Sequence, residues 1–379
     1  MTPVEDVREL GLHPQRWERV LQLINGWCGN GDLASAGIVV GNDRGMTRSF
    51  LFGKQGPGND ALPIRQDAIF LVASITKPLV GTAILTLVEK GLLTLGDRVE
   101  KYIPEFTRHR KHRITIRHLM THTSGLPDML PNNRELRKRQ APFNEFIQEI
   151  CELTPDFPAG RSVQYQSMGI ALLGETITRV TGRHYSQYLR EEILEPLGMK
   201  DSALGAPDEW FAGANPKSER IVESILPEDQ VGEDDWNWNS RYWRQLGAPW
   251  GGLLTTPADL GLFARMMMNK GKLGDVRILS PASVEGATRN QLGGFPDLAV
   301  EEKSHIPWGW TWRLHQPGRS ETFGDLWSPS SYGHWGSTGT VLWIDPVRNA
   351  FLVFLTTTPQ DPRGEFLARC SNAVQAALE

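Results

Sequence analysis

Apolar residues recur at helical spacing near the N-terminus, and short continuous apolar runs occur near both ends of the chain. Residues 17–27 place tryptophan and aliphatic side chains about one helical turn apart, which predicts a first helix. Short apolar runs bounded by turn-forming residues predict β-strands. Such runs lie at residues 36–41, 49–53, 339–344 and 350–356, and a final helix is predicted over residues 365–378.

Helical patterns dominate the middle of the chain. The apolar positions from residue 74 to residue 90 predict a long helix, and residues 170–180 and 185–194 have the pattern of amphipathic helices. Tryptophans alternate with small residues over 308–312, which predicts a strand with one aromatic face.

The order of these elements indicates a discontinuous domain. Residues 1–100 and 251–379 carry the predicted strands, so we expect them to form one α/β sheet domain. Residues 101–250 are expected to form a mainly helical lobe inserted into it. Because clefts between such lobes are common ligand sites, we expect the active site there.

Composition narrows the possible partners and compartment. The chain has 379 residues, 22% of them charged, with a formal net charge of −4, which gives no electrostatic reason to expect nucleic acid or a membrane as partner. The N-terminus lacks the basic and apolar regions of a signal peptide. Cys28, Cys151 and Cys370 are widely spaced and are expected to be buried free thiols. We therefore expect a cytoplasmic protein, with its oligomeric state left open.

Several histidines lie near a basic run. His109, His112, His118 and His122 have no nearby glutamate or cysteine at the spacing of a metal site. We therefore expect solvated histidines rather than metal ligands, and no cofactor.

The stretch with the clearest chemistry is Ser74-Ile-Thr-Lys77, at the start of the long predicted helix. Helix positions three apart lie on one face, so the Lys77 amine can take the proton of the Ser74 hydroxyl and make it a nucleophile. Pro78 cannot lie deep inside a helix, so the helix must begin near Ser74. The Ser74 amide is then among the unpaired donors at the helix N-terminus.

Two further stretches raise the case for catalysis. Tyr165-Gln-Ser167 precedes the predicted helix over residues 170–180 and could equally be a buried tyrosine with a capping serine. Residues 331–339 are rich in glycine and serine before a strand, which suits close approach of a ligand but also fits an ordinary turn.

Together these motifs resemble the serine β-lactamase and penicillin-binding-protein superfamily, and in particular its class C-like branch, which includes family VIII carboxylesterases and D-amino-acid peptidases. The similarity extends from about residue 15 to residue 375. It implies an antiparallel sheet flanked by helices plus a mainly helical lobe. The matching stretches are Ser74–Lys77, 116–127, Tyr165–Ser167, 251–260 and 333–340.

The resemblance also implies roles for individual residues. Ser74 would be the acylated nucleophile, Lys77 its proton acceptor, and Tyr165 the proton shuttle to the leaving group. The backbone amides of Ser74 and Ser337 would form the oxyanion hole. The residues implied to hold substrate are Ser167, His334, Trp335 and Gly336.

Two departures from the family pattern bear on the substrate. Ser167 stands where the family's β-lactamases usually carry asparagine, and His334-Trp335 stands where they carry Lys-Thr. A histidine is mostly neutral at neutral pH, whereas lysine provides a fixed positive charge for a substrate carboxylate. We therefore expect a small uncharged ester as substrate.

Other functions remain open from the sequence. They are a D-amino-acid or D,D-peptidase, a weak β-lactamase, an acyltransferase, and a non-catalytic binding module. Residues 233–243 mix acidic and aromatic side chains and could line a substrate mouth or form a surface loop held by tryptophans. Residues 134–139 are strongly charged and are expected to form an exposed helix face.

Overall fold

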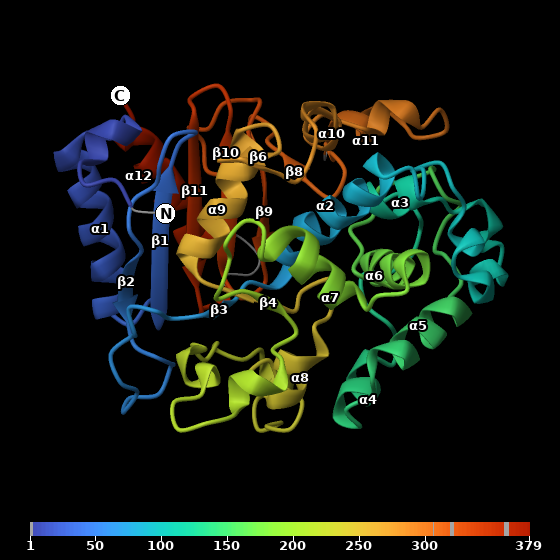
Figure 1. The fold of residues 1–379 in the computed structure, drawn as a ribbon, viewed down its shortest axis with the longest axis horizontal. Helices are drawn as coiled ribbons and strands as arrows, with labels where there is room; N and C mark the ends of the chain where they lie inside the picture. The colour runs from blue at the N-terminus through green and yellow to red at the C-terminus, as the bar shows by residue number, and fades with distance from the viewer. Residues whose placement is uncertain (1–2, 306, 319–321, 360–363) are drawn as a thin grey trace.

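The computed structural model describes residues 3–305, 307–318, 322–359 and 364–379. Its largest sheet has six strands in the order β2-β1-β11-β10-β9-β8, with every pair of neighbours antiparallel. Strands from the two ends of the chain thus meet in one sheet, with Val39 opposite Val353 (Figure 1). The strands are β1 (Ser35–Gly41), β2 (Phe50–Gly53), β8 (Arg313–Leu314), β9 (Tyr332–Gly336), β10 (Thr340–Asp345) and β11 (Ala350–Thr356).

Helices cover both faces of this sheet. Helices α1 (Pro14–Gly29) and α12 (Glu365–Ala377) pack on one face, and α9 (Pro257–Met268) packs on the other (Figure 1). Side chains alternate between faces along a strand. In β1, Ile38 accordingly belongs to the core under α1, whereas Val39 belongs to the core on the α9 side.

A mainly helical region lies beside the sheet (Figure 1). Its central helix, α6 (Met168–Thr181), packs on four other helices. These are α2 (Thr76–Glu89), α3 (Ile116–Met120), α5 (Phe143–Glu152) and α7 (Tyr185–Leu189), the last continuing as a π-helix over Arg190–Leu194. The remaining helices are α4 (Asn133–Lys138), α8 (Arg241–Leu246), α10 (Pro281–Ala287) and α11 (Val300–His305).

Two small sheets complete the fold. The first has three strands in the order β3-β5-β4, and the second is a β6–β7 hairpin. The three-stranded sheet carries the chain into α2, because β3 ends just before that helix. The strands are β3 (Phe70–Leu71), β4 (Ala203–Leu204), β5 (Leu253–Thr255), β6 (Lys272–Leu273) and β7 (Val276–Arg277).

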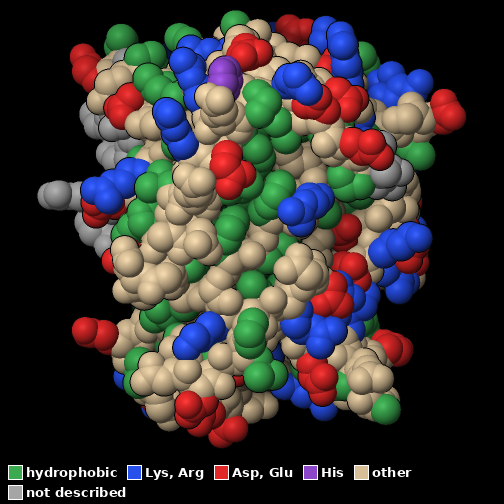
Figure 2. All heavy atoms as spheres, turned by 90° about the vertical axis from the view of Figure 1, so that its left-hand side faces the viewer, with side chains coloured by type: hydrophobic (Ala, Val, Ile, Leu, Met, Phe, Trp, Pro, Cys, Tyr) green, Lys and Arg blue, Asp and Glu red, His purple; other side chains and the backbone are tan. Residues whose placement is uncertain are grey.

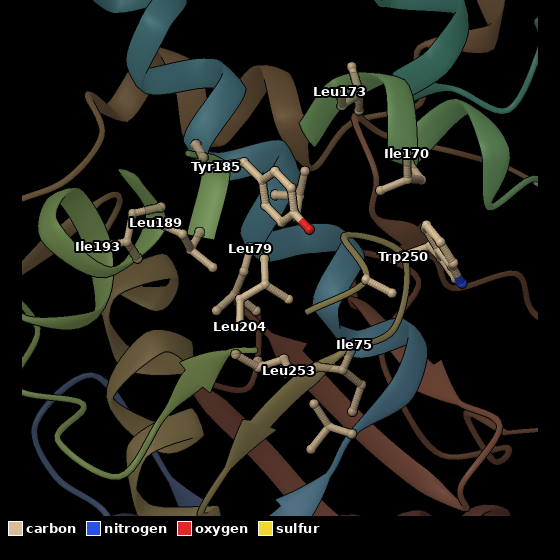
Figure 3. Packing of buried hydrophobic residues seen from close by; sticks show 14 of the residues in the cluster. Ile75, Leu79, Ile170, Leu173, Tyr185, Leu189, Ile193, Leu204, Trp250 and Leu253 are labelled. Atoms are coloured by element: carbon tan, nitrogen blue, oxygen red, sulfur yellow. The ribbon is translucent and has the colours of Figure 1, made fainter. Parts of the chain in front are cut away.

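Helix α2 is buried along nearly all its length. Leu79 has no exposed surface, and Figure 3 shows it packed among apolar side chains of α6, α7, β4 and β5. Because apolar neighbours surround it on all sides, α2 is fixed in position by packing rather than by its own helix propensity.

The predicted strands near both ends and the first and last helices are confirmed. The predicted helix from residue 74 begins instead with a 3-10 turn, Ala73–Ile75, followed by α2. Cys151 and Cys370 are buried free thiols, whereas Cys28 is half-buried. The division of the chain at residues 100 and 250 stays a prediction.

The predicted strand over residues 308–312 is wrong. Thr311 has a φ of 64°, and the Gly309 amide donates to the Trp312 carbonyl at 2.9 Å, so the chain reverses where a strand would continue. Trp308 forms only an isolated bridge with Arg313. The alternating tryptophans are therefore placed by a turn, which their spacing alone cannot reveal.

The outer surface beside α1 carries acidic and basic side chains intermixed, with a narrow run of hydrophobic side chains between them (Figure 2). Within the described residues, no helix combines the length and hydropathy needed to span a bilayer.

The burial of α2 generates a stability prediction. Leu79→Ala should lower the free energy of unfolding by about 2–5 kcal/mol, because the substitution leaves a cavity in a closely packed core. Chemical denaturation measures this change. Leu92→Ala is the control, since Leu92 is 50% exposed and its truncation should change stability little. Equal effects of the two substitutions would contradict the described packing.

Candidate active site

The turn that carries Ser74 is held in an unusual conformation. Ala73, the residue before it, has a φ of 46°, a left-handed value that costs a non-glycine residue about 1–2 kcal/mol. The Thr76 hydroxyl donates to the Ala73 carbonyl at 2.6 Å and accepts from the Leu253 amide at 3.0 Å. Backbone strain of this kind concentrates at functional sites.

The β9–β10 hairpin docks directly onto this turn. The Thr338 hydroxyl donates to the Leu71 carbonyl at 2.7 Å, and the Thr340 hydroxyl donates to the Val72 carbonyl at 3.0 Å. Gly336 makes the approach possible, because a Cβ atom there would lie 2.2 Å from the Val72 carbonyl oxygen. The hairpin thereby brings Ser337 to the same cavity as Ser74.

Ser74 and Lys77 form the hydrogen-bonded pair that their spacing predicts. The Lys77 Nζ lies 2.9 Å from the Ser74 Oγ and donates a second hydrogen bond to the Trp250 carbonyl at 2.9 Å. Lys77 has no exposed surface. Burial lowers the pKa of its amine to about 7, partly opposed by the negative charge of Asp128. A large fraction of the amine is therefore neutral at neutral pH.

Tyr165 lies against the same amine. The Lys77 Nζ is 4.7 Å from the centroid of the Tyr165 ring. Burial and the nearby Asp128 carboxylate raise the pKa of Tyr165 above its usual value, while a hydrogen bond with Ser74 acts in the opposite direction. The phenol is therefore protonated at neutral pH and can donate a proton.

Two buried histidines flank Tyr165. The centroid of the Tyr165 ring lies 6.0 Å from that of His334 and 4.9 Å from that of His122. The His334 Nδ1 lies 2.7 Å from the Trp335 carbonyl, to which it donates, and the His122 Nδ1 accepts from the Gln166 amide. Burial lowers the pKa of His334 to about 3 and that of His122 well below its ordinary value. Both imidazoles are therefore neutral.

Ser167 uses its hydroxyl within the protein. Its Oγ donates to the Asp128 carboxylate at 2.6 Å. The exposed Asp128 side chain therefore lies at the candidate site, although the sequence offered no signal for it beyond its place just after the 116–127 motif.

One cavity of about 190 Å³ brings most of the predicted residues together. The predicted residues that line it are Ser74, Tyr165, Ser167, Trp335 and Ser337. The lining does not include Lys77, His334 or Gly336, all of which are buried. The cavity is also lined by Asp128, Met129, Arg137 and Trp250, which the sequence did not identify as part of the site, and by Trp238 and Trp243 from residues 233–243.

Residues 233–243 were predicted either to line a substrate mouth or to form a surface loop held by tryptophans, and each interpretation applies to part of the segment. Trp238 and Trp243 line the cavity, as the substrate-mouth interpretation requires. Trp236 instead packs on Arg137 with 4.8 Å between its ring centroid and the guanidinium carbon. The expected exposed face over residues 134–139 is wrong for Leu136 and Arg137, because both are buried.

A family model described as beta-lactamase matches residues 30–375. A proposed D-alanyl-D-alanine carboxypeptidase of Escherichia coli strain K12 is 27% identical over 314 residues. That match covers 74% of this chain and 66% of the relative, slightly less than two thirds of its length.

Solved structures give the same picture. A penicillin-binding protein homologue from Caulobacter crescentus has a TM-score of 0.76 at 23% identity, covering 97% of this chain and 99% of that one. A family VIII carboxylesterase has a TM-score of 0.75 at 20% identity, covering 96% and 98%. These likenesses confirm the predicted fold class, an antiparallel sheet flanked by helices with an additional helical region.

The close approach of β9 to the Ser74 turn is testable. Gly336→Ala should lower the free energy of unfolding by about 1–3 kcal/mol, because the added Cβ meets backbone that cannot move aside. Denaturation and the rate of fluorophosphonate labelling of Ser74 report the effect. Gly293→Ala is the matched control, since a Cβ there has no atom within 4 Å. Unchanged stability and labelling in Gly336→Ala would contradict the described docking.

Proposed function

This chain belongs to the beta-lactamase family and has its serine-hydrolase fold, and we propose that it hydrolyses carboxylic esters through an acyl-enzyme on Ser74. The observation that carries the proposal is the buried Lys77 amine, 2.9 Å from the Ser74 hydroxyl and with a pKa of about 7. An amine that is largely neutral at neutral pH can act as the base that a serine nucleophile requires.

Acylation begins when the Ser74 Oγ attacks the ester carbonyl carbon and its proton passes to the Lys77 Nζ. The developing oxyanion lies at the Ser74 and Ser337 amides, which together would stabilise it. As the tetrahedral intermediate collapses, Tyr165 protonates the leaving alkoxide and takes the proton held by Lys77. The alcohol leaves, and the acyl group stays on Ser74.

Deacylation follows the same proton-transfer steps, with water as the attacking nucleophile in place of Ser74. A water molecule attacks the acyl carbon, its proton passes to the Tyr165–Lys77 pair, and the same pair returns a proton to the Ser74 Oγ as the acid leaves. Overall, one ester and one water become one acid and one alcohol, with every protein group restored.

The neutral His334 on β9 disfavours peptides and β-lactams that carry a carboxylate beside the reacting bond. His334 is neutral and its Nδ1 hydrogen is used on the Trp335 carbonyl, so this residue supplies no fixed positive charge for a carboxylate beside the reacting bond. Peptide or β-lactam hydrolysis is the second candidate, supported by the similarity to a proposed D-alanyl-D-alanine carboxypeptidase.

Replacing the nucleophile provides the direct test. Ser74→Ala should reduce kcat/KM for p-nitrophenyl butyrate by at least about a thousandfold, because the covalent route is lost. It should also abolish labelling by a fluorophosphonate probe. Ser330→Ala, at an exposed serine, is the control. Retained hydrolysis in Ser74→Ala would refute the assignment, and faster turnover of a β-lactam than of esters would favour the second candidate.

The Lys77 amine sets the expected pH dependence. Its neutral form is the base, and that fraction grows with pH, so kcat/KM should rise about tenfold per pH unit below pH 7 and level off above. His334→Asn should leave this inflection in place, because His334 has a pKa of about 3. A kcat/KM that stayed flat between about pH 5.5 and 8.5 would contradict Lys77 as the base.

A further inference from the structure

Arg137 is a buried cation that lines the same cavity as Ser74. It belongs to α4, and its side chain is 4% exposed. Two indole rings enclose the guanidinium, whose carbon lies 4.8 Å from the Trp236 ring centroid and 4.2 Å from that of Trp243. Such cation–π contacts hold the planar group in a fixed orientation.

The guanidinium has only neutral partners. Its Nη2 donates to the Gln230 side-chain oxygen at 3.1 Å and to the Trp236 carbonyl at 2.9 Å, and its Nε has no hydrogen-bond partner. Among the described residues, none of the ion pairs includes Arg137, although many other arginines on this protein are paired with acids. Burial lowers the pKa of Arg137 to about 10, so it is still charged at neutral pH. The Asp229 carboxylate favours this charge only from beyond ion-pair distance, and a buried charge without a paired counterion is unfavourable unless a ligand provides one.

The cation is connected to the reacting groups by direct contacts. The Trp243 ring lies 6.4 Å from the Trp250 ring, centroid to centroid, and the Trp250 carbonyl accepts the hydrogen bond from Lys77. Arg137 and the nucleophile are therefore held by one rigid set of tryptophans. Trp238, also in the cavity lining, adds a further apolar surface.

The arrangement of aromatic contacts indicates which part of a substrate would reach Arg137. Tyr165, the proposed donor to the leaving alcohol, stacks on Trp335 at 5.9 Å, whereas Arg137 packs on Trp236 and Trp243. A substrate bound with its alcohol toward Trp335 would have its acyl chain along Trp243 and Trp250. The Asp128 carboxylate beside Ser167 disfavours a second negative charge there and leaves Arg137 as the site for one.

We propose that Arg137 binds a carboxylate at the far end of the substrate's acyl chain, so that the preferred substrates are monoesters of dicarboxylic acids. This inference rests on the proposed ester hydrolysis and refines it. His334 on β9 supplies no positive charge, and Arg137 on α4 provides one at another part of the cavity wall. The ester bond itself still reacts in uncharged surroundings, while the tryptophan surfaces contact the methylene chain.

Hydrolysis of a matched pair of esters tests the inference. Monomethyl adipate and methyl hexanoate have acyl chains of equal carbon number and differ in the terminal carboxylate. Wild-type protein should prefer monomethyl adipate by about tenfold to a hundredfold in kcat/KM, the range expected of a charge-assisted contact. Arg137→Gln should lose this preference, so that its ratio of kcat/KM for monomethyl adipate to kcat/KM for methyl hexanoate falls to about one.

Arg134→Gln is the matched control, because Arg134 lies on the same helix but is exposed and paired with Glu233 at 3.1 Å. It should keep the preference for monomethyl adipate. An equal loss for both esters in Arg137→Gln would show that Arg137 only supports the structure, and that result would overturn the inference.

A binding measurement separates this inference from the proposed function and does not require a folded variant. Adipate should protect Ser74 of the wild-type protein from fluorophosphonate labelling at concentrations at least about tenfold lower than hexanoate. Equal protection by the two acids overturns the carboxylate site but leaves ester hydrolysis standing. Selective protection by adipate without turnover of any ester supports the carboxylate site and overturns the hydrolysis.

Discussion

The site depends on one amine being kept out of water. Lys77 has no exposed surface, and its Nζ lies between the Ser74 hydroxyl and the Trp250 carbonyl. Desolvation lowers its pKa to about 7, which makes a base from a side chain that is otherwise protonated. The burial is produced by α2 lying in the middle of the largest apolar core, so the packing of the whole molecule determines the reactivity of one atom.

Burial also determines the protonation states of the titratable groups around this amine. Burial, and after it the nearby Lys77 amine, lowers the pKa of His122 and His334 so that both are neutral, whereas burial and the Asp128 carboxylate raise the pKa of Tyr165 and keep it protonated. Among the described residues that line the cavity, Asp128 is an exposed carboxylate and Arg137 is a buried guanidinium. A substrate would therefore meet apolar surroundings at the reacting bond and charge farther away.

Much of the fold could be predicted from the chain because its signals are local. Apolar runs at both ends are the strands of the antiparallel sheet, and the periodic segments are helices. The strand prediction is wrong at residues 308–312, where the positive φ that reverses the chain falls on Thr311, a β-branched residue that does not signal a turn. Arg137 was placed on an exposed face because a hexapeptide rich in charge resembles a solvated helix, and the tryptophans that bury it lie about a hundred residues later.

The sequence by itself determined the spacing of Ser74 and Lys77, the motifs and their order, and hence the family. Each motif consists of residues close together in the chain, so it can be recognised without the fold. The tertiary structure decided the protonation states and the remaining members of the site. A pKa depends on how completely a group is desolvated and on which charges lie near it, and both are set by segments far apart in sequence. Asp128, Arg137 and Trp250 join Ser74 for that reason, through long-range packing that no local pattern records.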